Sequence, residues 1–101
     1  MDLGIQGKVA LVAASSQGLG LAVAEELAAE GARLVMCARG EDALRTACES
    51  IAERSGVEVL GIAGDLSQHA DIERIVYAGI DRFGQIDILV TNSGGPPTGV
   101  F

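Results

Sequence analysis

Residues 8–30, KVALVAASSQGLGLAVAEELAAE, contain three local patterns in succession. Val9–Ala13 is a short apolar run, and Ala14–Gly20 is a loop of small residues. Apolar residues then recur at helical spacing from Leu19 to Leu27, which predicts a strand, a tight turn and a helix. Backbone N–H groups at the start of such a helix, with the positive end of its dipole behind them, suit an anion such as a pyrophosphate.

The composition indicates one acidic domain with an aliphatic core. The chain has 101 residues, of which 49% are hydrophobic and 3% aromatic, and this length allows one domain with a modest core. The formal net charge of −7 argues against a nucleic-acid partner, for which a basic face is expected, and against an anionic membrane surface. Backbone amides and one local arginine are still enough to bind a phosphate group.

The cysteines and the apolar stretches bear on where the protein acts. Cys37 lies in an apolar strand pattern and Cys48 on an apolar helical stripe, and their spacing is not that of a metal site, so we expect reduced core cysteines. No stretch approaches the ~18 apolar residues of a membrane helix, and no charged-then-apolar leader precedes Lys8. We therefore expect a soluble, cytoplasmic protein.

The whole chain is expected to alternate strands with helices. The predicted strands cover residues 8–13, 33–38, 57–63 and 85–91. The predicted helices run from about Gly18 to Gly31, from Glu41 to Gly56, and from an N-cap at Ser67 to Gly84. The apolar stripe of the third helix consists of Ile72, Ile75, Val76, Ile80 and Phe83. Four strands, three helices and no hairpin signal predict an α/β fold with a parallel sheet covered on both faces.

In such a sheet a ligand belongs at the carboxyl ends of the strands. The small-residue loops all follow strands, so four of them are expected to converge there. These loops are residues 13–20, 38–40, 64–66 and 91–95. Their convergence is a stronger indication of a binding site than any single motif.

Two of these loops together carry a family resemblance. The spacing of Ala14, Gly18 and Gly20, read with Asn92-Ser93-Gly94 after the fourth strand, resembles the N-terminal half of the short-chain dehydrogenase/reductase family. In that family the first loop runs Thr-Gly-x-x-x-Gly-x-Gly and the fourth strand ends in Asn-Asn-Ala-Gly. The resemblance extends from Gly7 to Gly95 and is greatest to the 3-oxoacyl-carrier-protein reductases. It implies a Rossmann-like, doubly wound parallel sheet with strand order 3-2-1-4.

The resemblance also implies a dinucleotide site built from all these loops. The residues that would line the adenosine phosphates are Ser15, Ser16, Gln17 and Leu19. Gly18 and Gly20 would let the helix begin close to the pyrophosphate. At the adenine, the partners would be the Asp65 side chain and the Leu66 amide. The residues that would pass beneath the adenine-side ribose are Asn92, Ser93 and Gly94.

Three positions depart from the family pattern. Ala13 and Ala14 stand where the family has Thr and Gly, and Thr91 stands where the first Asn would be. Ala14 requires a negative φ and adds a methyl group beside the cofactor. The threonine hydroxyl expected to bond across to the fourth strand is also missing, and we expect Thr91 to restore part of that contact.

The end of the second strand bears on which nucleotide binds. An NAD-preferring site places an acid about 20 residues after the glycine loop, where it accepts hydrogen bonds from the ribose 2′-hydroxyl. Here that position is Ala38, and the next residue is Arg39, a fixed cation suited to a 2′-phosphate. This favours NADP(H) over NAD(H). The alternative is that Arg39 is only a solvated turn residue and that Glu41 or Asp42 supplies the acid.

No catalytic or metal site is predicted within the chain. His69 has no acid–base partner at motif spacing, and Tyr77 is followed four residues later by Asp81 instead of lysine. The aspartates are scattered and suggest no metal cluster, and Asp87 at the start of a strand is expected to be structural. The family resemblance implies a catalytic serine, tyrosine and lysine, aided by an asparagine, all C-terminal to Gly95.

We therefore expect residues 1–101 to be the dinucleotide-binding portion of an NADP-dependent carbonyl reductase or alcohol dehydrogenase, inactive without its catalytic half. The resemblance implies a small carbonyl or alcohol substrate, with a 3-oxoacyl thioester as one candidate, and a homo-oligomeric full-length protein. A non-catalytic nucleotide-binding or regulatory module is the alternative. A methyltransferase-like fold is less well supported, because such sites normally hold a ribose diol with a carboxylate after the second strand.

Overall fold

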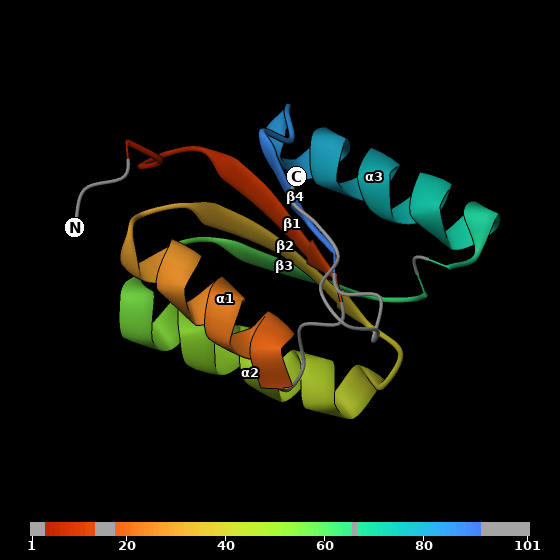
Figure 1. Cartoon of the computed structure of the whole chain (residues 1–101), viewed down its shortest axis with the longest axis horizontal. Coiled ribbons are helices and arrows are strands. Elements are labelled where there is room, and N and C mark those ends of the chain that lie inside the picture. Colours follow the sequence, from red (N-terminus) through yellow and green to blue (C-terminus); the bar gives the residue numbers. More distant parts are fainter. Residues whose placement is uncertain (1–3, 14–17, 66, 92–101) are drawn as a thin grey trace.

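A computed structural model describes residues 4–13, 18–65 and 67–91 of the chain. Within these ranges the elements alternate as predicted (Figure 1). They are β1 (Val9–Ala13), α1 (Gly18–Ala29), β2 (Arg33–Ala38), α2 (Glu41–Ser55), β3 (Val59–Ala63), α3 (His69–Phe83) and β4 (Ile88–Val90).

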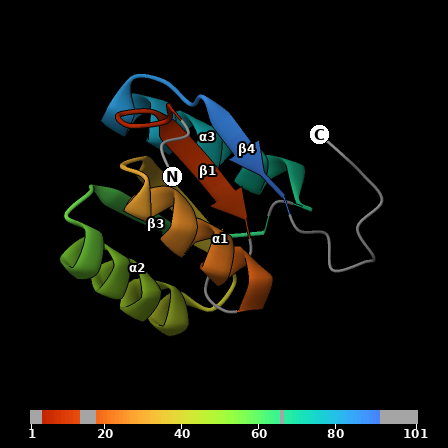
Figure 2. The ribbon, with the colours of Figure 1, turned by 60° about the vertical axis from the view of Figure 1, so that its left-hand side comes forward.

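The four described strands form one parallel sheet in the order β3-β2-β1-β4. Helices α1 and α2 cover one face and α3 covers the other, so the fold is doubly wound (Figures 1 and 2). Strand β1 lies between β2 and β4, and every residue of β1 is buried. The predicted Rossmann-like α/β architecture and strand order are confirmed.

Small residues set how closely the helices approach the sheet. The buried residues of α1 are Gly20, Ala24 and Ala28, spaced one helical turn apart, so a nearly flat stripe of α1 rests on the strands. On the opposite face, a Cβ added to Gly79 of α3 would stand only 3.1 Å from Cγ2 of Val35. The small side chains of this stripe are therefore what lets α1 lie close against the sheet.

The two faces of the sheet carry separate cores. On the α1 and α2 face, Leu44 and Ile51 pack with strand residues such as Leu34 and Met36. On the α3 face, Ile75 and Phe83 pack with the alternate strand residues. Burying one such aliphatic side chain contributes roughly 1.5–3 kcal/mol, so the sheet is stabilised from both sides.

The predicted stripe of α3 is only partly correct. Ile75 is fully buried and Phe83 is 8% exposed, but Ile72 and Ile80 are 36% and 43% exposed. Ile72 lies in the first turn of α3, ahead of the buried residues Ile75, Gly79 and Phe83. Ile80 lies at one margin of the stripe, so neither Ile72 nor Ile80 joins the core.

Glycines end two helices as predicted, but the start of α3 differs. Gly56 and Gly84 adopt φ of 77° and 84° after α2 and α3, a conformation that glycine favours. The N-cap of α3 is Gln68, not Ser67, and it makes no side-chain capping bond. The reason is that the Ser67 N–H donates to Oδ1 of Asp65 at 2.9 Å, which forms a side-chain turn before the helix.

The third and fourth strands are shorter than predicted. Strand β3 begins at Val59 instead of residue 57, and β4 covers only Ile88–Val90. Before β4, both the amide and the carboxylate of Asp87 bond to the backbone of Val9, at 2.8 and 2.9 Å. The Asp87 carboxylate accepts the Val9 N–H, which a backbone carbonyl would accept in a regular ladder. The regular strand therefore begins at the next residue, Ile88.

Neither cysteine forms a disulfide, and both are buried, as expected. The Sγ atom of Cys48 lies 3.8 Å from Sδ of Met36 in the core beneath α2. Burial, and to a smaller extent the nearby Glu49 charge, raises the pKa of Cys48 to about 11. This thiol is a neutral core group.

Candidate functional site

The candidate site lies where the parallel strands end, which we call the carboxyl end of the sheet. Register pairs Val12 with Val90 and Ala38 with Ala63, so these strands finish at nearly the same level. The described residues that leave β2 and β3, residues 39–40 and 64–65, lie at this end of the sheet. Of the predicted site residues, the structure describes Gly18, Leu19, Gly20, Arg39 and Asp65. The others lie outside the described residues: Ala14, Ser15, Ser16, Gln17, Leu66, Asn92, Ser93 and Gly94.

The N-terminus of α1 has the properties that an anion requires. Helix α1 begins at Gly18, whose φ of 65° favours glycine, and among the described residues no heavy atom lies within 4 Å of an added Cβ. Its first turn contains no acidic residue, so the positive end of the helix dipole is not neutralised there. Gly20 is buried against the sheet, whereas Leu19 is 65% exposed. Within the predicted turn from Gly18 to Gly20, the residue that faces the sheet therefore has no side chain, and the side chain of Leu19 extends into solvent.

Arg39 and Asp65, predicted from two separate strand ends, are brought together. Arg39 follows β2 and Asp65 lies two residues beyond β3, and Nε of the arginine is 3.8 Å from Oδ2 of the aspartate. The Arg39 side chain is 83% exposed, so its guanidinium remains open to a further anion. By contrast, Asp42 in the first turn of α2 accepts a hydrogen bond from Arg45 at 3.0 Å. That pairing fits a helix-start role for Asp42 better than the alternative role as the acid of the site.

The Asp65 carboxylate is held in its ionised form. Hydrogen bonds from the backbone and side chain of Ser67, followed by the charge of Arg39, lower the pKa of Asp65 and outweigh the opposing effect of partial burial. One oxygen, Oδ1, accepts the Ser67 N–H, and the other, Oδ2, faces Arg39. Asp65 is therefore an anionic acceptor of defined orientation at neutral pH.

Two further residues that the sequence analysis did not place in the site are connected to this turn. Oδ2 of Asp71 accepts the backbone N–H of Asp65 at 3.0 Å. One guanidinium nitrogen of Arg74 donates to Oδ1 of Asp71 at 3.1 Å and to the carbonyl of Ala63 at 2.8 Å. The spacing of three residues between Asp71 and Arg74 was the available signal, since such residues are neighbours on a helix surface.

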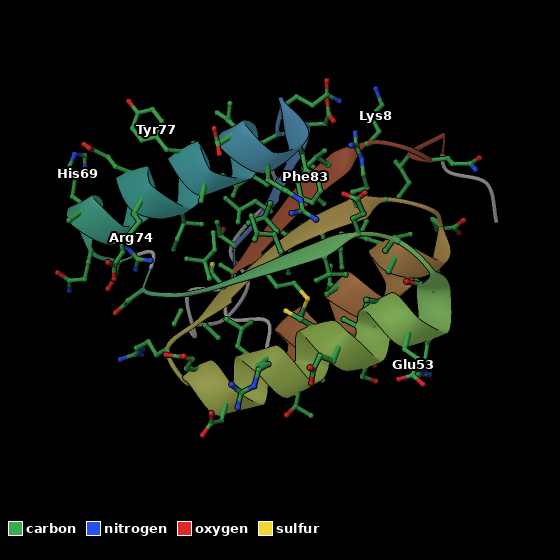
Figure 3. All side chains as sticks on the ribbon, turned by 180° about the vertical axis from the view of Figure 1, so that it is seen from behind. Lys8, Glu53, His69, Arg74, Tyr77 and Phe83 are labelled. Carbon is green, nitrogen blue, oxygen red and sulfur yellow. The ribbon has the colours of Figure 1, made fainter. Side chains whose placement is uncertain are left out.

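The other candidates are structural or solvated. His69 begins α3 and its Nε2 lies 3.0 Å from Glu73, with both side chains exposed. Tyr77 is 70% exposed on the same helix, and both His69 and Tyr77 point away from the sheet (Figure 3). Asp87 ties β1 to the start of β4 at the opposite end of the sheet.

Within the described ranges, no group of three or more His, Cys, Asp or Glu side chains is arranged to hold a metal ion. The same part of the chain contains no helix with the length and apolar character needed to cross a membrane.

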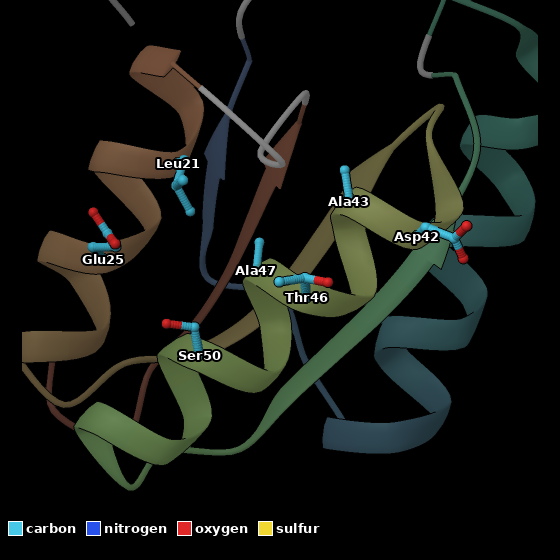
Figure 4. Close-up of a pocket in the computed structure, with 7 residues that line it drawn as sticks. All are labelled: Leu21, Glu25, Asp42, Ala43, Thr46, Ala47 and Ser50. Carbon is cyan, nitrogen blue, oxygen red and sulfur yellow. The ribbon is translucent and has the colours of Figure 1, made fainter.

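A surface pocket of about 480 Å³ lies between α1 and α2 (Figure 4). Its lining residues are Leu21, Glu25, Asp42, Ala43, Thr46, Ala47 and Ser50. None of the predicted site residues lines it, and two of its polar groups are carboxylates. A phosphate-bearing ligand is better matched by the α1 N-terminus and Arg39 than by this acidic pocket.

The chain is similar to known dehydrogenases and reductases. The family described as short chain dehydrogenase matches residues 8–101. The chain is 44% identical over 96 residues to the 1,6-dihydroxycyclohexa-2,4-diene-1-carboxylate dehydrogenase of Pseudomonas putida, which covers 94% of this chain and 34% of that protein.

Two solved structures are similar in both sequence and fold. The L-sorbose reductase of Gluconobacter frateurii, complexed with NADPH and L-sorbose, has a TM-score of 0.90 and 43% identity, over 99% of this chain and 38% of that one. An NAD⁺-bound xylitol dehydrogenase has a TM-score of 0.80 and 33% identity, over 84% of this chain and 32% of that one. Nucleotides of both kinds therefore occur among similar proteins.

The chain spans about a third of the length of the proteins it matches. The family match nevertheless covers nearly all of this chain, and the parallel sheet with the strand order β3-β2-β1-β4 agrees with it. The chain belongs to the short-chain dehydrogenase family.

Proposed function

We propose that residues 1–101 form the NADP-binding portion of an oxidoreductase that transfers hydride between NADPH and a carbonyl or secondary alcohol. The observation that carries the proposal is Arg39, an exposed cation directly after Ala38, the position at which an NAD-preferring site has an acid. The preceding residue, Ala38, is 6% exposed and carries no charge that could repel a 2′-phosphate. The NADPH held by the similar L-sorbose reductase supports the same nucleotide.

The described residues fit such a nucleotide at three points. The start of α1 offers a diphosphate a positive helix end without an acidic side chain in the first turn. Arg39 would bind the 2′-phosphate, while the Asp65 carboxylate would accept a hydrogen bond from the adenine amino group. NADPH supplies the hydride, and the role of this chain is to bind and orient it. We also propose nucleotide contacts for Ala14, Ser15, Ser16, Gln17, Leu19, Leu66, Asn92, Ser93 and Gly94.

The chemical step is proposed to need groups outside this chain. A carbonyl reduction requires a proton donor beside the substrate, and His69 and Tyr77 are exposed on α3 and point away from the sheet. We place the catalytic serine, tyrosine, lysine and asparagine, and most of the substrate site, in a portion beyond residues 1–101. The proposal includes a cytoplasmic, homo-oligomeric full-length protein, and two buried cysteines without a disulfide are compatible with a reducing compartment.

The nucleotide preference can be tested by titrating the chain with NADPH and with NADH and following nicotinamide fluorescence. Arg39→Ala is expected to weaken NADPH binding about tenfold, the loss typical of one charge-assisted contact, while NADH affinity changes less than about twofold. Arg45→Ala is the matched control, because Arg45 is also an exposed arginine paired with an aspartate. Equal losses for the two nucleotides in Arg39→Ala would contradict the assignment of NADP(H).

The alternative, a nucleotide-binding or regulatory module, shares the binding site but has no substrate. Mixing the chain with NADPH and a carbonyl substrate, including a 3-oxoacyl thioester, is expected to give no oxidation of NADPH beyond the uncatalysed rate. Turnover by residues 1–101 alone would show that the catalytic groups are present and would overturn the proposed division of the protein. Turnover by a longer chain containing residues 1–101 is expected under the oxidoreductase proposal and not under the alternative.

A further inference from the structure

The turn between β3 and α3 is tied to the helix by two side chains of α3. Figure 3 shows Arg74 on the side of α3 that faces the end of β3. Its guanidinium donates to the carbonyl of Ala63, the last residue of β3, at 2.8 Å. Asp71 reaches the same turn, because its Oδ2 accepts the N–H of Asp65 at 3.0 Å. These contacts hold the backbone on both sides of Gly64.

The two side chains also hold each other. Oδ1 of Asp71 accepts a hydrogen bond from Arg74 at 3.1 Å, so each oxygen of the carboxylate has its own donor. The Asp65 N–H and the Arg74 guanidinium lower the pKa of Asp71, so the carboxylate is ionised at neutral pH. Ile75, the residue after Arg74, is fully buried and anchors this part of α3 to the sheet. The bonds from Asp71 and Arg74 to the turn therefore come from a part of α3 that is held against the sheet.

Gly64 leaves the space that this arrangement needs. A Cβ at position 64 would stand 2.8 Å from a guanidinium nitrogen of Arg74 and 3.0 Å from Cδ1 of Ile75. Any side chain there would push Arg74 away from the turn. The short, side-chain-free turn and the two α3 residues thus form one packed unit.

This packed unit is connected through Asp65 to Arg39, the residue proposed to distinguish NADPH from NADH. Asp71 and Arg74 set the position of the Asp65 backbone, and Oδ2 of Asp65 lies 3.8 Å from Nε of Arg39. Arg39 is otherwise 83% exposed, and an unrestrained arginine loses side-chain entropy when it binds an anion. Orienting Arg39 beforehand reduces that cost.

We propose that Asp71 and Arg74 are positioning residues for the adenosine end of NADPH, acting through Asp65 on Arg39. This inference rests on the proposed function, in which Arg39 binds the 2′-phosphate of NADPH. Neither residue needs to touch the nucleotide. Their loss is expected to weaken NADPH more than NADH, because only NADPH carries the group that Arg39 binds.

The experiment measures NADPH and NADH dissociation constants for the unaltered chain, Asp71→Ala, Arg74→Ala and Arg74→Lys, at a temperature where circular dichroism shows each to be folded. NADPH binding is expected to weaken about three- to tenfold in the two alanine variants, the range of one lost charge-assisted contact, and the ratio of NADPH to NADH affinity is expected to fall. Arg74→Lys retains a cation that can reach one acceptor, so it should recover part of the loss. The Asp65 amide is expected to exchange with solvent faster in Asp71→Ala.

Asp87→Asn is the matched control for a purely structural effect. Asp87 also accepts a backbone N–H, from Val9, but at the opposite end of the sheet. It is expected to lower the unfolding temperature without changing the NADPH-to-NADH ratio. An unchanged ratio in both alanine variants, or the same change in Asp87→Asn, would overturn the inference and leave the proposed function standing. Failure of the unaltered chain to bind NADPH would overturn both.

Discussion

At the scale of single residues, three aspartates stabilise the fold through backbone amides. The Val9 N–H, followed by the Gln85 side chain, lowers the pKa of Asp87 despite partial burial, and the pKa values of Asp65 and Asp71 are lowered in the same way. A carboxyl whose pKa is lower in the folded than in the unfolded chain binds protons more weakly when folded. Its contribution is therefore present above the unfolded pKa and is lost as the pH falls through the folded pKa.

The first prediction concerns acid stability. The free energy of unfolding is expected to be flat near neutral pH and to fall below about pH 4, the ordinary aspartate range. Asp87→Asn should be less stable than the unaltered chain at pH 7, because it lacks the ionised carboxylate that accepts the Val9 N–H. The difference in the free energy of unfolding should shrink on acidification, because Asp87 itself is then protonated and neutral. Urea unfolding at several pH values measures both. A difference that stays constant down to pH 2 would contradict the account of Asp87.

The buried thiol of Cys48 is expected to react slowly with alkylating reagents. Its pKa of about 11 leaves very little thiolate at pH 8, and the residue is 9% exposed. Iodoacetamide at pH 8 is therefore expected to modify Cys48 slowly in the folded chain and rapidly in 6 M guanidinium chloride. Mass spectrometry of a Cys37→Ala variant isolates the reaction at Cys48. Equal rates in the two conditions would show that this part of the core is open.

At the scale of elements, the packing of α2 on β3 depends on Gly61. A Cβ at this position would lie 2.7 Å from Sγ of Cys48, which packs in turn on Met36. Gly61→Ala is expected to lower the free energy of unfolding by about 1–3 kcal/mol, as overpacking of a core does. Adding Cys48→Ala should restore part of that loss, because the clashing sulfur is removed. Non-additivity in this double-mutant cycle, measured by urea unfolding, is the expected result, and simple additivity would contradict the contact.

The elements also show why the sequence predicted some features and not others. Apolar runs and glycine stops define β1, β2 and α2 locally, so their limits followed from the sequence alone. The N-cap of α3 and the start of β4 depend on the side chains of Asp65 and Asp87, whose partners no local pattern announces. The Asp71–Arg74 pair was missed for the same reason, because its importance comes from bonds to Ala63 and Asp65 in the preceding turn.

The candidate site was predictable where it depended on topology. Parallel strands necessarily bring their carboxyl ends together, so residues following β2 and β3 could be expected at one place. The ion pair between Arg39 and Asp65 agrees with that expectation. Eight further predicted residues lie outside the described residues, and their contacts with a nucleotide remain predictions: Ala14, Ser15, Ser16, Gln17, Leu66, Asn92, Ser93 and Gly94.

At the scale of the whole molecule, one side of the described sheet ends in an apolar edge. No described strand pairs with the outer side of β4, and Leu89 is 55% exposed there. An unpaired strand with an exposed apolar side chain tends to pair with another chain. Light scattering of residues 1–101 is therefore expected to show concentration-dependent association. Leu89→Lys should reduce this association. Tyr77→Lys is the control and should have little effect, because it removes an exposed aromatic side chain on the outer side of α3. A monomer at all concentrations would contradict the prediction.

NMR titration of the isotopically labelled chain with NADPH shows, residue by residue, whether the nucleotide binds at the carboxyl end of the sheet. Amide shifts are expected to change at Gly18, Gly20, Arg39 and Asp65, while amides at the opposite end, such as those of Gly7 and Gly84, stay unchanged. Shifts confined to the pocket between α1 and α2, or no shifts at millimolar NADPH, would rule out binding at this end of the sheet.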